Sequence, residues 1–249
     1  MEYGTGCLVC GDELIYSEIF TTRTCFYCGV TKESNASCCE GHYVCDACHN
    51  GTANDLIERY CRASESVSPL SMALTLMKNP AVKMHGPEHH FLVPAVLLAA
   101  YYDRPTAAKV DVVEKIREAR NRAKDVKGGF CGFQGACGAA IGAGIFMSIV
   151  TGATPLSDRE RKLSNMITAE CLRVIAENGG ARCCKRESFS AIITAVEFVR
   201  AEFGVVLRVE LPTPCAFTNL NRECLRERCR FFGVERKADS NSMSRGETK

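Results

Sequence analysis

Residues 128–156 read GGFCGFQGACGAAIGAGIFMSIVTGATPL and contain no charged side chain. The run is long enough to cross a bilayer as a helix. Its first half, however, consists largely of glycine, alanine and cysteine, so its mean hydropathy is low, and no distinct basic flank adjoins it. We therefore expect a helix buried inside a helical protein, rather than a membrane span.

Segments with helical signals lie on both sides of this run. Ser68 followed by Pro69 has the signature of an N-cap and the first residue of a helix. Ser157 and Glu160 have the spacing of a capping box at the start of another helix. Only VVLRVEL, residues 205–211, has the pattern of a strand. The sequence thus predicts a mainly α fold.

Cysteine is the unusual feature of the composition. The chain has 249 residues, a net charge of +2 and 17 cysteines. So small a net charge gives no strong field over the whole surface, and any contact with nucleic acid would need a local basic patch. The N-terminus, MEYGTGCLVCG, has no basic region leading into an apolar run, which favours a cytoplasmic protein. In that compartment thiols are metal ligands or reactive groups more often than disulfides.

The first fifty residues hold eight cysteines in a pattern typical of structural zinc. The first set of expected ligands consists of two CxxC pairs, each followed by glycine: Cys7, Cys10, Cys25 and Cys28. The second set comes from the segment CCEGHYVCDACH, with Cys38 and His49 as substitutes. The ligands expected there are Cys39, His42, Cys45 and Cys48. An iron–sulfur cluster is the alternative, but the histidine among the cysteines favours zinc.

The spacing of these pairs allows two arrangements. The pairs can close in sequence order as two ribbons, or they can interleave as in the cross-braced RING-like and FYVE-like folds. In either case zinc would hold together a segment too short to build a hydrophobic core. We expect a zinc-ribbon or treble-clef-like module at residues 1–50, a helical metal and thiol domain at 51–233 and a disordered tail at 234–249.

Two cysteine pairs further along the chain each precede a helix. Cys131 and Cys137 lie in the glycine-rich approach to one helix, and Cys183 and Cys184 precede another. The unpaired N–H groups at a helix N-terminus stabilise an anion, so a thiolate there has a lowered pKa and is a better nucleophile. We take Cys137 and Cys184 as candidate catalytic residues. The alternative is that the glycines only allow close packing of helices.

The segment HGPEHH begins at His85 and has the H-x-x-E-H form of certain zinc proteases. Those enzymes carry the motif on a continuous helix, which Pro87 would interrupt here, so a protease is not expected. Glu88 and His89 are instead candidates for proton transfer, and His85 is a candidate metal ligand. The alternative is that these residues only cap a helix.

Three cysteines near the C-terminus, Cys215, Cys224 and Cys229, do not have the spacing of a zinc knuckle. They suit three thiolates around a [4Fe–4S] cluster, with zinc or no metal as the alternatives. The arginines between them could equally form a solvated or RNA-contacting face. The full set of predicted cofactor-binding residues is Cys131, Cys137, Cys183, Cys215, Cys224 and Cys229.

As a set, HGPEHH, GGFCGFQGACGAAIGAG, ARCCKRESF and CAFTNLNRECLRERCRFF resemble a cysteine-rich family of unknown function from anaerobic bacteria and methanogens. The resemblance covers roughly residues 40–233. More loosely, GACGAAIGAGIFMSIVTG is similar to the redox-active family named after its CGCAxxG–C–C motif. This sequence departs from that motif, because Ala136 precedes Cys137 where the motif has cysteine and glycine. Neither resemblance implies an established reaction.

These patterns predict a metalloprotein with a cysteine-built iron–sulfur or thiolate site and redox, sulfur-transfer or desulfuration chemistry on a small sulfur-containing or redox-active ligand. Zinc and a [4Fe–4S] cluster are the expected cofactors. The alternative is a zinc-binding adaptor in which every cysteine is structural and RERCRFFGVERK, residues 226–237, contacts RNA or a partner protein. A thiol redox sensor without a cluster is a third interpretation. The glycine-rich helix is equally suited to a homodimer interface.

Overall fold

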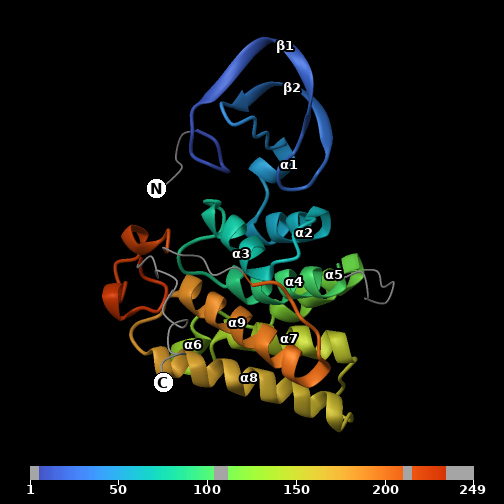
Figure 1. Ribbon diagram of the computed structural model, residues 1–249, viewed down its shortest axis with the longest axis vertical. Helices are drawn as coiled ribbons and strands as arrows, with labels where there is room; N and C mark the ends of the chain where they lie inside the picture. The colour runs from blue at the N-terminus through green and yellow to red at the C-terminus, as the bar shows by residue number, and fades with distance from the viewer. Residues whose placement is uncertain (1–5, 104–111, 210–214, 234–249) are drawn as a thin grey trace, which may run out of the picture.

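The computed structural model describes residues 6–103, 112–209 and 215–233, so the predicted tail at 234–249 lies outside the described residues. Figure 1 shows a curved pair of strands at one end and a body of packed helices below it. The helices are α1 (Asp46–His49), α2 (Ala53–Ala63), α3 (Pro69–Lys78), α4 (Glu88–Tyr102), α5 (Val112–Ala123), α6 (Phe130–Phe133), α7 (Gly138–Thr151), α8 (Arg159–Asn178) and α9 (Cys184–Phe203), with 3₁₀ turns η1 (Thr218–Leu220) and η2 (Arg226–Arg228). The predicted mainly α fold is confirmed.

The strands lie in the cysteine-rich N-terminal part, where the sequence analysis expected none. β1 (Leu14–Thr24) and β2 (Thr31–Cys38) form an antiparallel hairpin. The β1 segment, LIYSEIFTTRT, is rich in the β-branched and aromatic residues that favour strands. The pairing shifts register between Tyr16 and Thr21, and the hairpin curves over as Figure 1 shows. The strand predicted at 205–211 is absent from its described part, 205–209, which has no strand beside it to pair with.

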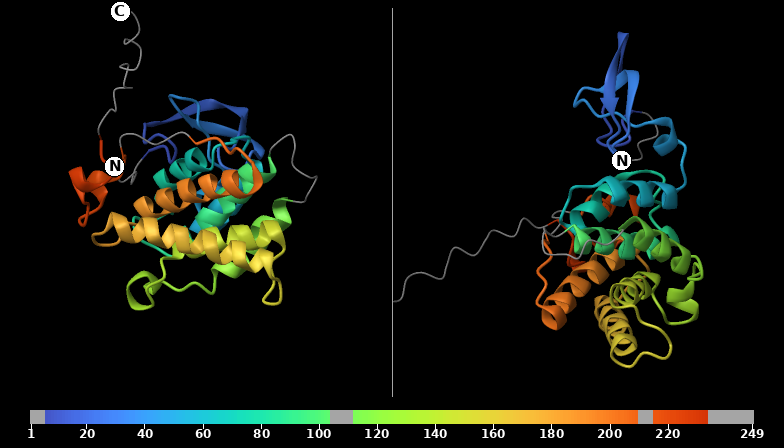
Figure 2. Two further views of the ribbon diagram at one scale, coloured as in Figure 1. Left: turned by 60° about the horizontal axis from the view of Figure 1, so that its bottom comes forward. Right: turned by 90° about the vertical axis from the view of Figure 1, so that its right-hand side faces the viewer.

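Helix α4 forms the centre of the helical body. Every residue from Phe91 to Ala100 is buried, and the helix continues through Pro94. A helix that is apolar on all sides needs neighbours on all sides. Helices α2, α3, α5, α7 and α9 supply them. Figure 2 shows α7, α8 and α9 side by side in a further layer.

The glycine-rich run forms α7, which is buried against α4, α8 and α9. A Cβ atom at Gly142 would lie 2.9 Å from both the carbonyl oxygen of His90 and the Cδ atom of Pro94. A Cβ atom at Gly144 would overlap Thr168 of α8. These glycines therefore allow α7 to approach its neighbours more closely than any other residue would. In the described part of the chain, no helix is long and apolar enough to cross a membrane.

Helix ends follow local signals in most places. Ser68 caps α3, and Pro69 is its first residue, as predicted. The capping box predicted at Ser157 is wrong: the N-cap of α8 is Asp158. The hydroxyl of Ser157 instead accepts a hydrogen bond from the backbone N–H of Thr154, at 3.0 Å, and closes a turn ahead of the helix. The sequence correctly indicated a helix start in this region, but the turn at Thr154 uses the Ser157 side chain that was expected to cap the helix.

Candidate metal centres and thiol cleft

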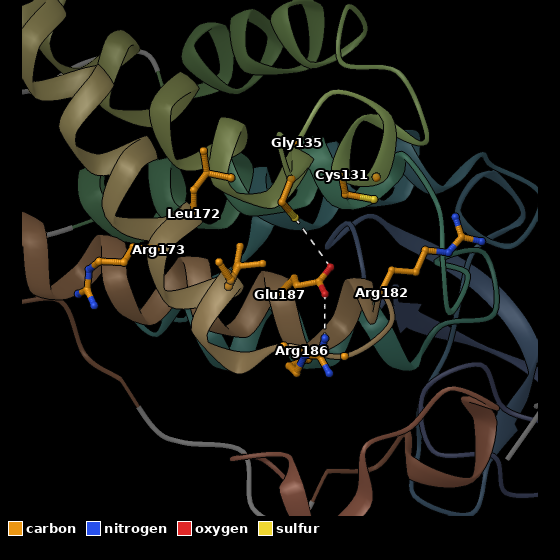
Figure 3. Close-up of a pocket in the computed structure, with 13 residues that line it drawn as sticks. Cys131, Gly135, Leu172, Arg173, Arg182, Arg186 and Glu187 are labelled. Carbon is orange, nitrogen blue, oxygen red and sulfur yellow. Dashed lines mark hydrogen bonds and ion pairs between the residues drawn. The ribbon is translucent and has the colours of Figure 1, made fainter.

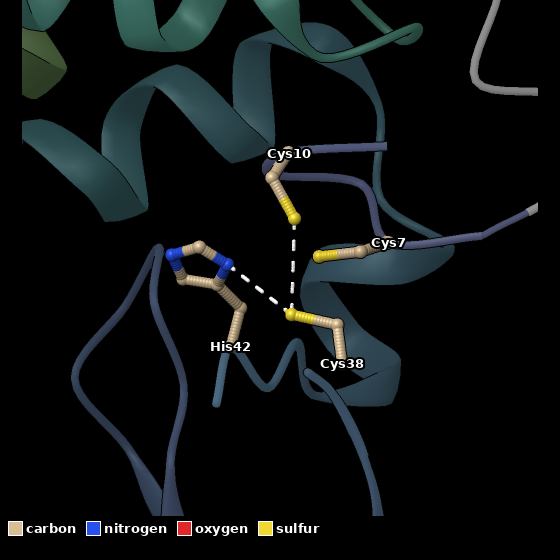
Figure 4. Close-up of side chains that lie close together, drawn as sticks. All are labelled: Cys7, Cys10, Cys38 and His42. Atoms are coloured by element: carbon tan, nitrogen blue, oxygen red, sulfur yellow. Dashed lines mark hydrogen bonds between the residues drawn. The ribbon is translucent and has the colours of Figure 1, made fainter. Parts of the chain in front are cut away.

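Two groups of four potential metal ligands lie in the N-terminal segment, which we define as residues 6–50. The first group is Cys7, Cys10, Cys38 and His42, and the second is Cys25, Cys28, Cys45 and Cys48. In each group the ligand atoms all lie within 4.8 Å of one another. Figure 4 shows the four side chains of the first group pointing toward one point. Either group could hold a metal ion such as zinc.

The ligand separations have the size that one tetrahedral ion requires. The sulfur atoms of Cys10 and Cys38 are 3.8 Å apart, and those of Cys28 and Cys45 are 3.7 Å apart. Zinc–sulfur bonds of about 2.3 Å at the tetrahedral angle place two thiolates about 3.8 Å apart. The Nδ1 atom of His42 lies 3.4 Å from the sulfur of Cys38, so the imidazole faces the same point as the three thiols.

The two groups interleave along the chain, so of the two arrangements left open by the spacing the structure has the cross-braced one. The first group gathers at the open end of the hairpin, where Leu14 pairs with Cys38. The second group includes the loop between the strands, closed by a hydrogen bond from Cys25 N–H to the carbonyl of Val30 at 2.8 Å. His42 belongs to the first group, and the next residue, Tyr43, forms a bridge with Cys25 of the second. The two ends of the hairpin therefore lie close together, which requires the hairpin to curve.

One predicted ligand, Cys39, lies outside both groups of four and is grouped instead with the exposed carboxylates of Asp12 and Glu40. Cys38 belongs to the first group, and Cys39 does not. Successive side chains at a strand point to opposite faces, so only one of two adjacent cysteines can face Cys7. Cys38 ends β2 and is buried, whereas Cys39 is exposed, with its thiol 3.6 Å from a carboxylate oxygen of Asp12.

The second group is fastened to the helical body by aromatic side chains. Tyr27 is buried beside that group, and its hydroxyl donates to the carbonyl of Leu8 at 2.9 Å. Its ring meets that of Tyr60 on α2 with the centroids 6.1 Å apart. Phe26 stacks on the same Tyr60 ring at 6.4 Å. The loop that carries the ligands thus docks on α2.

A further set of cysteines lines one narrow cavity beside the start of α9, which we call the cysteine cavity. Its cysteines are Cys183, Cys215, Cys224 and Cys229. Aromatic side chains form much of its wall: Phe189, Phe217 and Phe231. Among the described residues, these thiols are not as closely grouped as the two N-terminal sets, since no three of them lie within 4.8 Å of one another.

Backbone N–H groups point at two of these sulfur atoms. The N–H of Arg186 donates to the sulfur of Cys183 at 3.5 Å, and the N–H of Arg226 donates to that of Cys224 at 3.4 Å. Burial raises the pKa of Cys183 to about 11 and also raises that of Cys215. The thiols of Cys183 and Cys215 are therefore protonated at neutral pH, and a bound metal would displace their protons.

A wider cleft of about 580 Å³, which we call the thiol cleft, opens between the approach to α7, the end of α8 and the start of α9. Cys131 and Cys137 both line it. The predicted set of six cofactor-binding cysteines therefore divides in two: these two face the thiol cleft, and the other four line the cysteine cavity. Arg186 lines both and lies between them.

Glu187 organises the thiol cleft, as Figure 3 shows. The thiol of Cys137 donates to one carboxylate oxygen of Glu187 at 3.8 Å. The other oxygen accepts from the backbone N–H of Cys183 and from the Nη2 atom of Arg186, both at 3.1 Å. Sequence reasoning missed Glu187 and Arg186. The capping-box signal does not identify this contact, because it places the glutamate three residues after the N-cap, whereas Glu187 follows Cys183 by four.

The predicted lowering of thiol pKa at helix N-termini is wrong for Cys137, Cys183 and Cys184. Burial, and next the negative charge of Glu187, raise the pKa of Cys137 to about 12. Backbone N–H groups of Ala139 and Ala140 act in the opposite direction but do not prevail. Burial likewise raises the pKa of Cys184. Desolvation of the thiolate outweighs the field of the helix end at these buried positions.

The histidine segment lies against both cysteine-bearing helix starts. The backbone N–H of Gly86 lies against the thiol of Cys184. A Cβ atom at Gly138, the first residue of α7, would overlap the ring of His90. His90 is held there because its Nδ1 donates to the carbonyl of Val126 at 2.9 Å. The N-termini of α4, α7 and α9 thus meet in one region.

Glu88, predicted to transfer protons, and His85, predicted to bind metal, both have other contacts in the structure. Glu88 accepts a hydrogen bond from the backbone N–H of Lys83 at 2.9 Å and so braces the preceding loop. His85 has its Nε2 atom 3.6 Å from a carboxylate oxygen of Glu223, and among the described residues no group of three metal ligands includes it. Neither residue lines the thiol cleft or the cysteine cavity.

His89 is buried in the first turn of α4. Its Nδ1 donates to the carbonyl of Gly86 at 3.1 Å, which leaves Nε2 as a lone-pair acceptor without a partner in the described structure. Burial, and next the positive charge of Lys185, lower its pKa to about 3. Lys185 is itself buried and donates to the carbonyls of Met77 and Val82. His89 is therefore a neutral imidazole at any physiological pH.

Two four-ligand groups on a mainly helical chain define a cysteine-rich protein that could bind metal. Comparison with protein families assigns the chain further: the family of unknown function DUF5714 matches residues 57–232. The protein belongs to that family. The match spans the helical body and the C-terminal cysteines and begins beyond the two N-terminal ligand groups. No curated protein and no solved structure matches the chain.

Proposed function

We propose that residues 6–50 hold two structural zinc ions and that the rest of the chain is an iron–sulfur protein. In this proposal a [4Fe–4S] cluster occupies the cysteine cavity and serves redox or sulfur-transfer chemistry on a small ligand in the thiol cleft. The observation that carries the proposal is the meeting of Cys183, at the start of α9, with three cysteines from a separate C-terminal segment around one cavity.

The chemistry of the ligands supports zinc in one region and a cluster in the other. Four closely grouped thiolate and imidazole ligands with no open position are typical of structural zinc. In a cluster, iron and sulfide atoms stand between the protein thiolates, which are therefore farther apart than around a single ion. The looser grouping, the aromatic wall and the N–H donors to Cys183 and Cys224 all suit a cluster.

The neighbouring thiol cleft supports a chemical role. Its volume of about 580 Å³ is that of a small-molecule site. Cys137 lies there with its thiol on a carboxylate, and Arg186 separates the cleft from the cysteine cavity. A ligand in the cleft would meet free thiols on one side and lie beside the cluster on the other. Cys137 is the proposed reactive thiol.

Metal and sulfide analysis of protein purified without oxygen tests this proposal. We expect about two zinc, four iron and four sulfide per chain, with a broad absorption band at about 400 nm. Cys224→Ser and Cys229→Ser are expected to lose iron and sulfide while keeping zinc. Cys39→Ser, at an exposed cysteine outside every group of four, serves as the matched control and keeps all three. A colourless protein with zinc alone would reject the cluster.

A zinc-binding adaptor is the second candidate, and one observation favours it. Large apolar side chains in the first part of β1 are exposed: Ile15, Tyr16, Ile19 and Phe20 are 54–72% accessible. Such a patch on a soluble surface commonly meets another protein. In this interpretation the cysteine cavity holds a third zinc ion, and metal analysis of the same preparation gives about three zinc and no iron.

A further inference from the structure

The charges around the thiol cleft do not cancel. Three arginines line it, Arg173, Arg182 and Arg186, against one carboxylate, Glu187. Arg173 is paired with Glu170 and Glu177, and Arg186 is paired with Glu187. For Arg182, no carboxylate in the described part of the chain lies within ion-pair distance. Among the described residues that line the cleft, Arg182 is thus the arginine without a carboxylate partner.

Arg186 offers a second and independent indication of a ligand. Its side chain is 4% exposed. Its Nη2 donates to the carbonyl of Ala181 at 3.0 Å and to Glu187 at 3.1 Å. Its Nε is buried and has no acceptor among the described residues. A buried guanidinium N–H without an acceptor is costly, and a shift of the Arg186 side chain on ligand binding would bring it to an oxygen of the ligand.

The rest of the cleft wall suits a small carbon skeleton. The end of α8 contributes apolar side chains: Leu172, Ile175 and Ala176. Opposite them, the approach to α7 contributes Cys131 and Cys137. The cleft therefore has a basic end, an apolar wall and a thiol side.

We propose that the thiol cleft binds a small monocarboxylic acid, whose carboxylate lies against the guanidinium groups of Arg182 and Arg186 while its other end faces Cys131 and Cys137. Arg173 and Arg186 already have carboxylate partners, so Arg182 offers one cation to a ligand, and a carboxylate matches that single charge better than a phosphate with nearly two negative charges. This inference rests on the proposed function, because it names the ligand class of the same cleft.

Two alkylating reagents of the same reactivity type and different charge test the inference. Iodoacetate carries a carboxylate and iodoacetamide is neutral, and both react with the same thiolate. The ratio of their rates at one cysteine is therefore independent of the pKa of that thiol. The reagents are applied without oxygen to the full-length protein, and each cysteine is quantified by peptide mass spectrometry.

The chain provides its own reference cysteine for this experiment. Cys131 and Cys39 are both exposed, but Cys131 lines the basic cleft and Cys39 lies beside Asp12. We expect the iodoacetate-to-iodoacetamide rate ratio to be about tenfold or more higher at Cys131 than at Cys39, as a local charge at near-contact distance gives. Propionate, but not propionamide, is expected to slow the alkylation of Cys131 by iodoacetamide.

Charge reversal at Arg182 is the decisive variant. Arg182 is exposed, so Arg182→Glu leaves the core unchanged, and we expect it to lower the ratio at Cys131 about tenfold without changing that at Cys39. Arg161→Glu, at an exposed arginine in the first turn of α8, makes the same change in net charge away from the cleft and is expected to have no effect. Equal ratios at Cys131 and Cys39, or no response to Arg182→Glu, would overturn the inference.

Iron, sulfide and zinc are measured on the same preparations, which keeps the two proposals separable. Full iron and sulfide with no anion preference at Cys131 rejects the carboxylate site and leaves the cluster standing. An anion preference that depends on Arg182 in a protein without iron rejects the cluster and leaves the carboxylate site standing.

Discussion

The N-terminal segment and the helical body are held together by different means. In residues 6–50 the buried apolar side chains are almost entirely ligand cysteines: Cys7, Cys25, Cys38, Cys45 and Cys48, with Tyr27. The helical body instead buries α4 on all sides with aliphatic residues. In the first region the potential metal ligands make up the buried core, whereas in the second the cysteine cavity lies at the edge of a larger apolar core, to which its wall residues Phe189, Phe217 and Phe231 also belong. In the proposed function, the zinc ions would therefore be required for folding in one region and the cluster for chemistry in the other.

Removal of metal is expected to give the largest difference in stability between the N-terminal segment and the helical body. A chelator strong enough to remove zinc should unfold residues 6–50, because the binding free energy of a structural zinc ion, about 10–16 kcal/mol, is also folding free energy. The helical body should keep its secondary structure. Helix content from circular dichroism and protease cleavage mapped by mass spectrometry check both halves. Loss of most of the helical signal on chelation would show that the two regions do not differ in this way.

Adjacent cysteines sharpen the comparison within the N-terminal segment. Cys38→Ser is expected to reduce zinc from two ions to one and to open the first group, because a hydroxyl is a poor replacement for a thiolate ligand. Cys39→Ser should keep both ions, since Cys39 lies outside the group. Zinc analysis of the two variants decides the matter. The reverse result would mean that the end of β2 has the other face toward Cys7.

These residues also show how far sequence reasoning reaches. Pairs such as Cys7 and Cys10 are recognisable because both ligands come from one turn. The choice between Cys38 and Cys39 depends on which face of a strand each occupies, and the hairpin itself was not predicted. Spacing also could not choose between sequential and cross-braced groups, because that choice is made by the curvature of the hairpin.

The candidate site in the helical body was harder to predict for a related reason. The contact between Cys137 and Glu187 joins residues on two helices, α7 and α9, that meet only through tertiary packing. The same packing buries the thiol and raises its pKa, which reversed the expectation drawn from the helix start alone. Helix ends, by contrast, were predictable where one side chain decides, as Ser68 does for α3.

Acid should test whether the helical body is stabilised by its buried neutral groups rather than by metal. His89 has a pKa lowered from 6.5 to about 3 in the folded protein, so below pH 6.5 the unfolded chain binds a proton that the folded chain does not. Above pH 6.5 His89 is neutral in both states and does not oppose folding. Between pH 6.5 and about 3 it lowers the free energy of unfolding by about 1.4 kcal/mol for each pH unit.

His89→Asn keeps a donor for the carbonyl of Gly86 and removes the titration. We expect its free energy of unfolding, followed through the helical signal, to fall less steeply between pH 6 and 4 than that of the unchanged protein. The difference in slope should be about 1.4 kcal/mol per pH unit, the value for one proton. His49→Gln, at an exposed histidine in the N-terminal segment, should keep the original slope. Equal slopes in all three proteins would place the acid sensitivity elsewhere.

The smallest expected effect concerns packing alone and involves no metal. Gly142→Ala introduces a Cβ atom 2.9 Å from the carbonyl oxygen of His90 and from Pro94, so α7 and α4 must separate. We expect a loss of about 1–3 kcal/mol, even though alanine favours a helix over glycine by about 1 kcal/mol. Gly128→Ala is the matched control, because nothing lies within 4 Å of its Cβ position. Denaturant unfolding followed by circular dichroism measures both. If Gly142→Ala were as stable as Gly128→Ala, close approach of α4 and α7 would not be what the glycine-rich run provides, and its composition would need a separate cause near the thiol cleft.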